Sequence, residues 1–437
     1  MTVPCCTSQA EAPSGVSPSS TASRTMRDGP SGQLGERFDA VRAASVAFAS
    51  GLSDADATVQ SMPDASPIKW HLAHTTWFFE TFLLGEHGAR AGRPYRPHDP
   101  RYAFLFNSYY EAAGPRHPRP QRGLLSRPTL DEVLAYRHHV DAAMHERLLH
   151  ADLPREVSDL ITLGLHHEEQ HQELMHTDLL HLFAQNPLRP AHREFPAAGE
   201  TLATPLRWIE LGGGQHRIGH GDRGDDLQAT TFAFDCETPA HDVIVRPFAL
   251  ASRVVTNGEW RAFIEDGGYR MAGLWLSDGW ATVQREGWGH PLYWELRDGE
   301  WYSMTLAGMQ PVDDNAPVRH VSYFEADAFA RWAGKRLPTE HEWEVAARRH
   351  AADDNSPLQQ LYGPVWQWTA SPYVAYPGFR TAAGAVGEYN GKFMCGQFVL
   401  RGASLATPAG HTRATYRNFF YPHQRWQFCG LRLAEDR

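Results

Sequence analysis

The chain has 437 residues, which is more than one hydrophobic core usually organises, so we expect two domains. A content of 42% hydrophobic and 21% charged residues is typical of a globular protein and excludes a chain that is disordered throughout. A formal net charge of -10, without a long basic run, argues against binding to nucleic acid or to anionic membranes. A small-molecule partner is therefore expected.

The cysteines and the lack of long apolar stretches bear on the cellular location of the protein. The five cysteines are scattered and lack the CxxC spacing of zinc sites and redox motifs. No stretch approaches the roughly 20 apolar residues of a membrane span, and the N-terminus lacks the apolar centre of a signal peptide. These features favour a cytoplasmic protein that does not bind membranes.

The first part of the chain divides into a tail and a helical domain. Residues 1–34 are rich in Ser, Pro, Gly and Ala, and such a segment cannot offset the entropy of ordering, so we expect a disordered tail. From residue 35 to 190 the spacing of apolar residues predicts a domain of four helices. They are expected over residues 36–52, 66–84, 129–151 and 155–184.

Two of these helices begin with capping signals. Ser66 can cap the second helix with Pro67 at its first position. Thr129 and Glu132 form the capping-box pattern at the start of the third. Between these two helices lies an irregular segment, about residues 91–128, and loops of this length are usually functional.

After residue 200 the pattern changes to short alternating strands with many glycines and tryptophans. It continues to the last residue, 437. We therefore expect a second, loop-rich α+β domain over residues 200–437.

The fourth predicted helix carries the string HHEEQHQELMH, from His166 to His176. His167 and His171 fall at helical spacing on the apolar stripe, whereas the other polar residues of the string are expected on solvated faces. The stripe consists of Leu160, Leu163, Leu174, Leu179 and Leu182. Two imidazoles at i and i+4 can reach one ion, so we favour a metal site over a buried hydrogen-bonded pair.

The same string contains HExxH, which in zinc proteases supplies a glutamate base, here Glu168. Its place in a bundle helix and the lack of a third-ligand signature disfavour a protease. The third ligand is expected on the second helix, in WHLAHTTWFFE, where periodicity leaves His71 and His74 both open. Three histidines without a thiolate suit Fe(II), Zn(II) or Ni(II).

Several segments resemble a known family. WHLAHTTWFFE and HEEQHQELM resemble the iron-binding segments of the ergothioneine-biosynthesis sulfoxide synthases and of their ovothiol and selenoneine relatives. Five later segments are similar to the formylglycine-generating-enzyme fold: VVTNGEWRAFIEDGGY, RLPTEHEWEVAARR, GPVWQWTASPY, VLRGAS and CGLRLAEDR. The resemblance implies a DinB-like four-helix bundle over residues 35–190 and a formylglycine-generating-enzyme-like, C-type-lectin domain over residues 200–437.

The resemblance also implies an activity. Members of this family are non-haem iron enzymes that use dioxygen to join a thiol, or a selenol in the selenoneine branch, to C2 of the imidazole of hercynine, which is N-trimethylated histidine. It implies His74, His167 and His171 as the ligands of Fe(II). The expected partners are hercynine, a thiol or selenol donor and dioxygen.

Further site residues follow from the resemblance. Gln170, between the two ligands on the fourth helix, would hydrogen-bond the substrate imidazole. Arg119 and Arg122 would bind carboxylates of the thiol substrate, a task that suits arginine. Tyr109 and Tyr110 resemble family tyrosines that donate a proton to reduced oxygen, and only one of them needs to face the iron.

Near the C-terminus, Asn418 matches a family substrate contact. Phe419 and Phe420 stand where one branch of the family has a tryptophan and an aspartate. Because that aspartate contacts γ-glutamylcysteine, its absence argues against this dipeptide as the donor. Free cysteine or a selenium-bearing sugar is favoured instead.

Two other activities share parts of this sequence pattern. The DinB-like bundle also hosts metal-dependent thiol S-transferases that use zinc or nickel. A formylglycine-generating oxidase would need a suitably placed cysteine pair, and the surroundings of Cys395 and Cys429 do not resemble one. Both are ranked below the iron enzyme.

Overall fold

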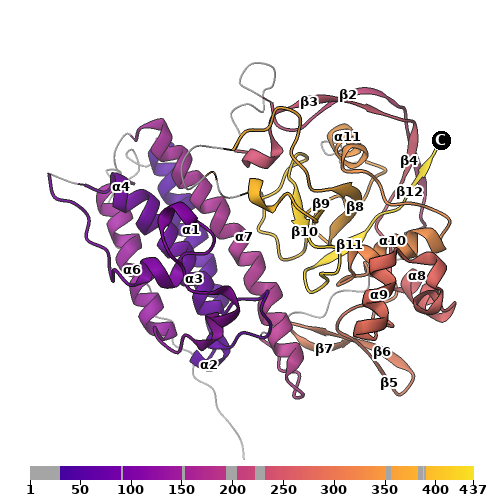
Figure 1. Cartoon of the computed structure of the whole chain (residues 1–437), viewed down its shortest axis with the longest axis horizontal. Helices are drawn as coiled ribbons and strands as arrows, with labels where there is room; N and C mark the ends of the chain where they lie inside the picture. The colour runs from indigo at the N-terminus through magenta and orange to yellow at the C-terminus, as the bar shows by residue number, and fades with distance from the viewer. Residues whose placement is uncertain are drawn as a thin grey trace, which may run out of the picture.

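The computed structural model describes residues 30–89, 92–149, 153–192, 204–221, 232–350, 356–381, 387 and 390–437. Figure 1 shows a bundle of helices beside a mixed body of strands and helices, with α7 (Arg155–Gln185) running between them. Most of the predicted tail, residues 1–29, lies outside the described residues. The first helix begins at Pro30, four residues before the last predicted tail residue.

The four predicted helices are present. They correspond to α1 (Pro30–Ala49), α3 (Ile68–Phe78), α6 (Leu130–Arg147) and α7. A π-helical turn, Phe79–Leu84, prolongs α3 into α4 (Gly85–His87). Shorter elements are α2 (Asp54–Thr58), α5 (Tyr102–Phe106) and the 3-10 turns Glu111–Ala113 and Arg119–Leu124, so the predicted irregular segment contains single helical turns.

One predicted cap is confirmed and the other is wrong. At α6 the Thr129 side chain accepts from the backbone of Glu132, whose carboxylate accepts from the backbone of Thr129. At α3 the capping position is Pro67, which has no side chain able to cap. Ser66 precedes the capping position, and its hydroxyl accepts from Arg122 at 2.9 Å instead of from the helix backbone.

The faces of α7 differ from the prediction. Leu160, Leu163, Leu174 and Leu182 of the predicted stripe are only half-buried. The polar residues expected in solvent are instead covered: His166, Glu169 and Gln172 are buried, and Glu173 and His176 are half-buried. The reason is that α7 packs on the bundle with one side and on the C-terminal body with the other (Figure 1).

The C-terminal body contains small sheets with helices around them. Its strands are β1 (Trp208–Leu211), β2 (Gly214–Ile218), β3 (His241–Val245), β4 (Phe248–Ala251), β5 (Trp294–Arg297), β6 (Glu300–Thr305), β7 (Gly308–Pro311), β8 (Trp366–Pro372), β9 (Phe398–Gly402), β10 (Asn418–Phe420), β11 (Cys429–Leu431) and β12 (Ala434–Asp436). Its α-helices are α8 (Asn257–Glu265), α9 (Ser277–Glu286), α10 (Tyr323–Trp332) and α11 (Glu340–His350). The predicted α+β character is confirmed.

Aromatic contacts connect β10, an edge strand of its sheet, to the bundle. The sheets have the orders β1-β4-β12, β10-β9-β8-β11, β2-β3 and β5-β6-β7. All pairs are antiparallel except β8 and β11. Tyr109, in the loop of the bundle, contacts Phe393 edge-to-face at 5.1 Å between ring centroids, and Phe393 lies 6.0 Å from Phe419 of β10. In the described part of the chain, no helix is long and apolar enough to cross a bilayer.

A buried ion network fixes the segment that leads into β10. Glu340 of α11 accepts two hydrogen bonds from Arg417, at 2.9 and 3.0 Å, and one from Arg401 at 2.9 Å. Burial alone would raise the pKa of Glu340, but the charges of the two arginines outweigh it and hold this pKa below its usual range.

The Glu340 network makes stability dependent on pH. Glu340→Gln is expected to lower the free energy of unfolding by about 3–5 kcal/mol at neutral pH, because buried Arg417 loses its carboxylate partner and Arg401 keeps only Glu344. The folded-state pKa is lowered, so the contribution is complete above the ordinary glutamate pKa of about 4.3 and is lost as the pH falls through the lower folded value. Chemical denaturation from pH 7 to 3 should show the variant and wild type converging in acid. The exposed control Glu300→Gln should follow wild type at every pH, and a constant gap for Glu340→Gln would contradict the argument.

Candidate metal centre

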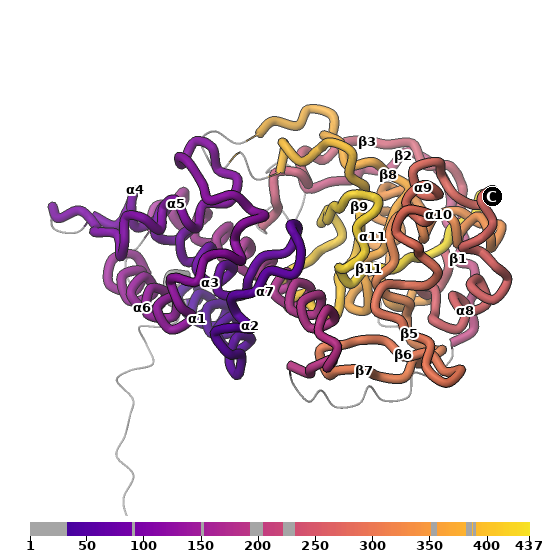
Figure 2. Tube along the Cα trace, turned by 60° about the horizontal axis from the view of Figure 1, so that its bottom comes forward, coloured from indigo at the N-terminus to yellow at the C-terminus, as the bar shows by residue number. Residues whose placement is uncertain are grey.

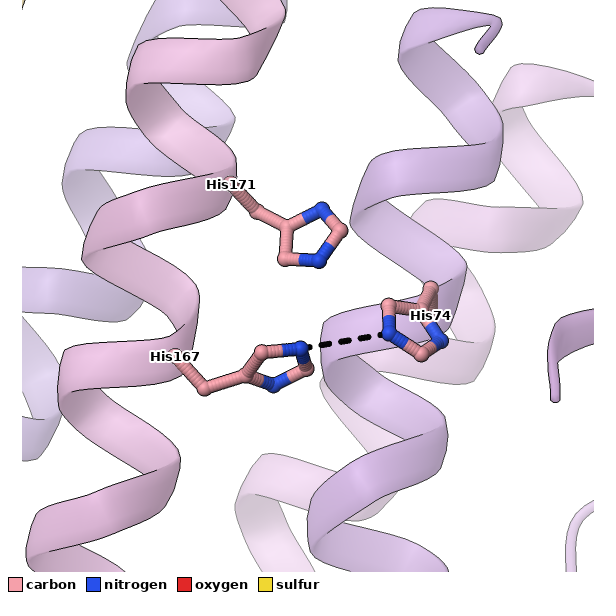
Figure 3. A group of neighbouring side chains, drawn as sticks. All are labelled: His74, His167 and His171. Atoms are coloured by element: carbon pink, nitrogen blue, oxygen red, sulfur yellow. Dashed lines mark hydrogen bonds between the residues drawn. The ribbon is translucent and has the colours of Figure 1, made fainter. Parts of the chain in front are cut away.

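Three histidine rings converge between α3 and α7. His74 comes from α3, and His167 and His171 lie one turn apart on α7, as Figure 3 shows. One ring nitrogen from each lies within 4.8 Å of the other two, and all three side chains are buried. The Nε2 atoms of His74 and His167 are 3.2 Å apart. At this distance one nitrogen can donate to the other, and with both unprotonated the two could bind one cation.

Hydrogen bonds set which nitrogen of His74 faces the site. Its Nδ1 lies 2.6 Å from the carbonyl oxygen of Phe106, which can only accept. Nδ1 therefore carries the proton, and Nε2 presents its lone pair toward His167. The ring also stacks on Trp70, with centroids 4.7 Å apart, which fixes its plane.

A second set of hydrogen bonds orients His171. It involves His71, the other candidate for the third ligand. His71 Nε2 lies 3.0 Å from Asp178 Oδ2, and His71 Nδ1 lies 2.8 Å from His171 Nδ1. Because a carboxylate accepts, His71 donates from Nε2 and accepts at Nδ1, so His171 donates from Nδ1. Its Nε2 is then unprotonated. His71 thus lies behind a member of the cluster, while His74 belongs to it.

Burial keeps the three rings neutral, which is the form that binds metal. Burial lowers the pKa of His167 to about 3. Burial, together with the other histidines, holds the pKa values of His74 and His171 well below their usual range. The residues therefore fit a metal with three neutral nitrogen ligands.

The role of Asp178 can be tested separately from the ligands. Asp178→Asn is expected to weaken metal binding about 10- to 100-fold, because the amide no longer fixes the tautomers of His71 and His171. Competition against a chromophoric chelator measures the dissociation constant. An unchanged affinity in a folded variant would show that this orientation has no effect on the metal.

The glutamate of the HExxH string points away from the histidines. Glu168 is buried and accepts from Arg42, at 2.8 Å, from Ser45, at 2.6 Å, and from Arg137. Burial alone would raise the pKa of Glu168, but the charges of Arg137 and Arg42 bring it to about 2. A carboxylate held by two arginines is a poor base, so the structure argues against the protease interpretation.

Of the two predicted arginines, one lies beside the cluster. The Arg122 guanidinium lies 3.3 Å from the ring centroid of Trp70, the ring that stacks on His74. It donates to Ser66 and Ser108 and has no carboxylate partner among the described residues. Burial lowers the pKa of Arg122, yet a guanidinium stays protonated in proteins. Arg119 is exposed and donates to the backbone of Asp64.

The two tyrosines occupy different places. Tyr110 is fully buried among Trp77, Phe78 and Phe82, with centroid distances of 5.7, 6.5 and 5.2 Å. Phe78 in turn lies 5.0 Å from the ring of His167. Tyr109 stacks on Tyr110 at 4.7 Å and faces the C-terminal body.

A chain of hydrogen bonds across the domain boundary ends on Gln170. Arg37 donates to His166 Nε2 at 3.0 Å, and Glu169 lies 2.9 Å from His166 Nδ1 and 2.8 Å from His411 Nδ1. His411 Nε2 lies 3.2 Å from the Tyr416 hydroxyl, which accepts from Gln170 Nε2 at 2.7 Å.

The groups in this hydrogen-bond chain determine which atoms donate and which accept. A guanidinium only donates and a carboxylate only accepts, so both imidazoles donate to Glu169 through Nδ1. With a neutral His411, the Tyr416 hydroxyl donates to its Nε2 and accepts from the NH₂ of Gln170. The amide oxygen of Gln170 is then directed elsewhere.

His166, Glu169 and His411 also form a group whose ligand atoms lie within 4.8 Å of one another. Their polar atoms already satisfy one another, and the Arg37 guanidinium at 3.0 Å from His166 would repel a cation. We interpret this group as a hydrogen-bonded link between domains.

Comparison with known proteins gives the family. The DinB superfamily matches residues 37–175, and the sulfatase-modifying factor enzyme 1-like domain matches residues 201–357 and 354–437. Hercynine oxygenase of Mycolicibacterium thermoresistibile is 34% identical over 88% of this chain and 90% of its own length. That of Mycobacterium tuberculosis is 32% identical over 88% and 94%. The chain belongs to the hercynine oxygenase family.

Membership of the hercynine oxygenase family confirms the resemblance and the predicted fold class. It supports an enzyme of the oxygenase class over the S-transferase alternative. The formylglycine-generating enzyme of Streptomyces coelicolor is 35% identical over only 36% of the chain. Cys236 and Cys429 are buried, Cys395 is exposed, and all three are free, so no disulfide joins them.

The C-terminal residues predicted from the hercynine oxygenase resemblance lie on β10. Asn418 accepts the backbone N–H of Phe419 at 2.8 Å. Phe419 stacks on Tyr373 with centroids 4.1 Å apart, and Phe420 lies 6.0 Å from Trp426. β10 is joined to the bundle loop through Phe393.

Sequence reasoning missed three residues that orient the site. Asp178 follows His171 by seven residues, a spacing that returns to the same helix face and could have indicated a partner. His411 and Tyr416 carry no local signal, because only the docking of the two domains brings them to Gln170.

Proposed function

We propose that this protein is a non-haem iron enzyme that uses dioxygen to form a carbon–sulfur or carbon–selenium bond at C2 of the hercynine imidazole. The convergence of His74, His167 and His171 from two helices carries the proposal. The similarity to hercynine oxygenases supports hercynine as the substrate. A cytoplasmic location remains a prediction.

Iron fits the centre by its ligand set. His74, His167 and His171 would hold Fe(II) through three neutral nitrogens, and the bound ion would supply the redox chemistry that dioxygen needs. For a thiol donor the reaction balances: hercynine loses the hydrogen at C2, the thiol loses its hydrogen, and dioxygen provides one oxygen to the sulfoxide and one to water.

In this proposal Gln170 binds hercynine. The hydrogen-bond chain directs its amide NH₂ to Tyr416, at 2.7 Å, and we propose that its amide oxygen accepts from an imidazole N–H of hercynine. Asn418 is a second proposed contact, supported by the connection of β10 to the bundle loop.

Tyr416 allows this role to be tested without changing Gln170 itself. Tyr416→Phe removes the hydroxyl that fixes the amide, so KM for hercynine is expected to rise roughly tenfold, by the value of about one hydrogen bond. Steady-state oxygen consumption measures it, with bound iron unchanged. If KM stays at the wild-type value while the hydroxyl is gone, Gln170 does not depend on this chain.

The donor is assigned to the side of the cluster where Arg122 lies. A buried guanidinium without a carboxylate partner is suited to an anionic group of the donor, and the two serines hold it in place. Arg119, exposed and bound to backbone, is the weaker candidate. Phe419 and Phe420 carry no charge where one branch of the family has an aspartate that contacts γ-glutamylcysteine. Their presence therefore favours cysteine or a selenium-bearing sugar as the donor.

A tyrosine would supply a proton to reduced oxygen. Tyr110 is the better placed of the two, because its neighbours Trp77 and Phe78 contact the rings of His74 and His167. Tyr109 lines the boundary with the C-terminal body. We propose Tyr110 as the proton donor and Tyr109 as its packing support.

The proposal is tested by incubating iron-loaded protein in air with hercynine and, in turn, cysteine, γ-glutamylcysteine, a thiosugar and a selenosugar. Product mass and oxygen uptake are recorded together. Uptake should occur only when hercynine and a donor are both present. No uptake with any donor would refute the proposal, and anaerobic turnover with zinc would favour the S-transferase.

A further inference from the structure

A cavity that the clustered histidines do not line lies between the C-terminal half of α7 and the β5-β6-β7 sheet. Figure 2 shows this sheet against the end of α7. The cavity measures about 570 Å³, within the range of about 300–1,000 Å³ that small-molecule sites occupy. Neither the three clustered histidines nor any predicted substrate contact lines it.

The walls of this cavity are mainly apolar. They include Leu180 of α7, Trp294 and Met304 of the sheet, and Phe428. Most of its polar side chains are already engaged within the wall. Asn257 donates to the carbonyl of Asp313 at 2.7 Å, Thr305 to Gly308 at 2.9 Å, and Gln310 to Ala307 at 3.0 Å.

Arg319 is the exception in this wall. It makes no hydrogen bond or ion pair with any residue that the structure describes, and burial lowers its pKa without an opposing carboxylate. Asp313 also lines the cavity, but its carboxylate accepts from the backbone of Asn315 at 2.9 Å and forms no ion pair with Arg319. Beside it, His320 has a buried Nδ1 without a hydrogen-bond partner among the described residues.

Three buried arginines of the C-terminal body show what is unusual about Arg319, which is half-buried. Arg401 and Arg417 share the carboxylate of Glu340. Arg432 has no carboxylate, yet it donates to three oxygens, of Gln367, Ala251 and Gln359, at 2.6–2.9 Å. A guanidinium that faces an apolar cavity without an acceptor is costly unless a ligand supplies one.

We propose that this cavity binds an organic anion whose oxyanion head pairs with Arg319 and whose apolar body lies along Leu180, Met304 and Phe428. The ligand is distinct from the substrates proposed for the metal centre. A carboxylate and a phosphate ester would share this chemistry, because a guanidinium pairs with either in the same bidentate manner.

Isothermal titration calorimetry on the full-length protein tests the proposal with octanoate and octyl phosphate as probes and octanamide as the uncharged control. At least one anion should bind at least about tenfold more tightly than octanamide. Octanoate alone would assign carboxylates, octyl phosphate alone would assign phosphates, and both would assign oxyanions in general. Failure of both anions, or equal binding of the amide, would overturn the proposal.

Two variants assign the binding to Arg319 and to the cavity. Arg319→Met should reduce anion affinity to the level of octanamide, whereas Arg285→Met, at an exposed arginine of α9, should leave it unchanged. Ala307→Trp keeps Arg319 and fills the cavity, so it should abolish binding even if Arg319→Met does not fold. Bound iron should match wild type in all three, and wild-type anion affinity in either Arg319→Met or Ala307→Trp would refute the site.

Discussion

His167→Ala is expected to abolish iron binding and to reduce oxygen consumption by more than about 100-fold. The loss exceeds the 10- to 100-fold range of changes that merely disturb a ligand, because one of three coordinating nitrogens is removed. His74 and His171 would retain two nitrogens from different helices, too few to hold the ion. Iron per protein by mass spectrometry, together with an oxygen electrode, measures both effects.

The matched control is His138→Ala. His138 is an exposed histidine of α6, away from the cluster, so iron content and turnover should equal those of wild type. Circular dichroism should show that His167→Ala keeps its helices. Stoichiometric iron in that variant would mean that His167 is not a ligand.

Arg122→Met is expected to raise KM for the sulfur or selenium donor about 10- to 100-fold, with kcat for the saturated enzyme within a few fold of wild type. The reason is the loss of a charge-assisted hydrogen bond, worth about 1.5–3 kcal/mol, to the donor. The methionine can still cover Trp70, so the packing beside His74 is retained. Steady-state oxygen uptake at saturating hercynine, with the donor varied, gives both constants.

Two further arginine variants sharpen this result. Arg122→Lys keeps the charge but cannot form two parallel hydrogen bonds to one anionic group. Its KM for the donor should therefore lie between those of wild type and Arg122→Met. Arg119→Met should change KM much less, because the Arg119 side chain is exposed and contacts the backbone of Asp64. An equal rise of KM for hercynine in Arg122→Met would instead place Arg122 at the other substrate.

Local signals in the sequence predicted local structure well. The capping box at Thr129 forms as expected, because its two hydrogen bonds involve residues three apart. Ser66 failed as a cap for the opposite reason: its hydroxyl accepts from Arg122, which is 56 residues away. Helix starts that also take part in tertiary contacts cannot be assigned from a pattern of four residues.

The difference between local signals and tertiary contacts also applies to the histidine cluster. The i, i+4 pair of His167 and His171 could be found by spacing alone, because one helix presents both. Spacing could not decide whether His71 or His74 is the third ligand. In the structure His74 belongs to the cluster, and His71 contacts His171 from outside it.

The solvated faces assigned to α7 were wrong because hydrophobic periodicity assumes one buried side. Glu173 shows the consequence: its carboxylate accepts from Trp366, Ser404 and Thr407 of the C-terminal body, at 2.6–2.7 Å. A charged helix face that docks on a second domain has the same sequence pattern as one that faces water.

Anomalous diffraction from crystals of the iron-loaded protein, recorded on both sides of the iron absorption edge, tests the central claim most directly. We expect one iron peak between the ring nitrogens of His74, His167 and His171. A peak in the group formed by His166, Glu169 and His411, or none in protein that consumes oxygen with hercynine and a donor, would contradict it.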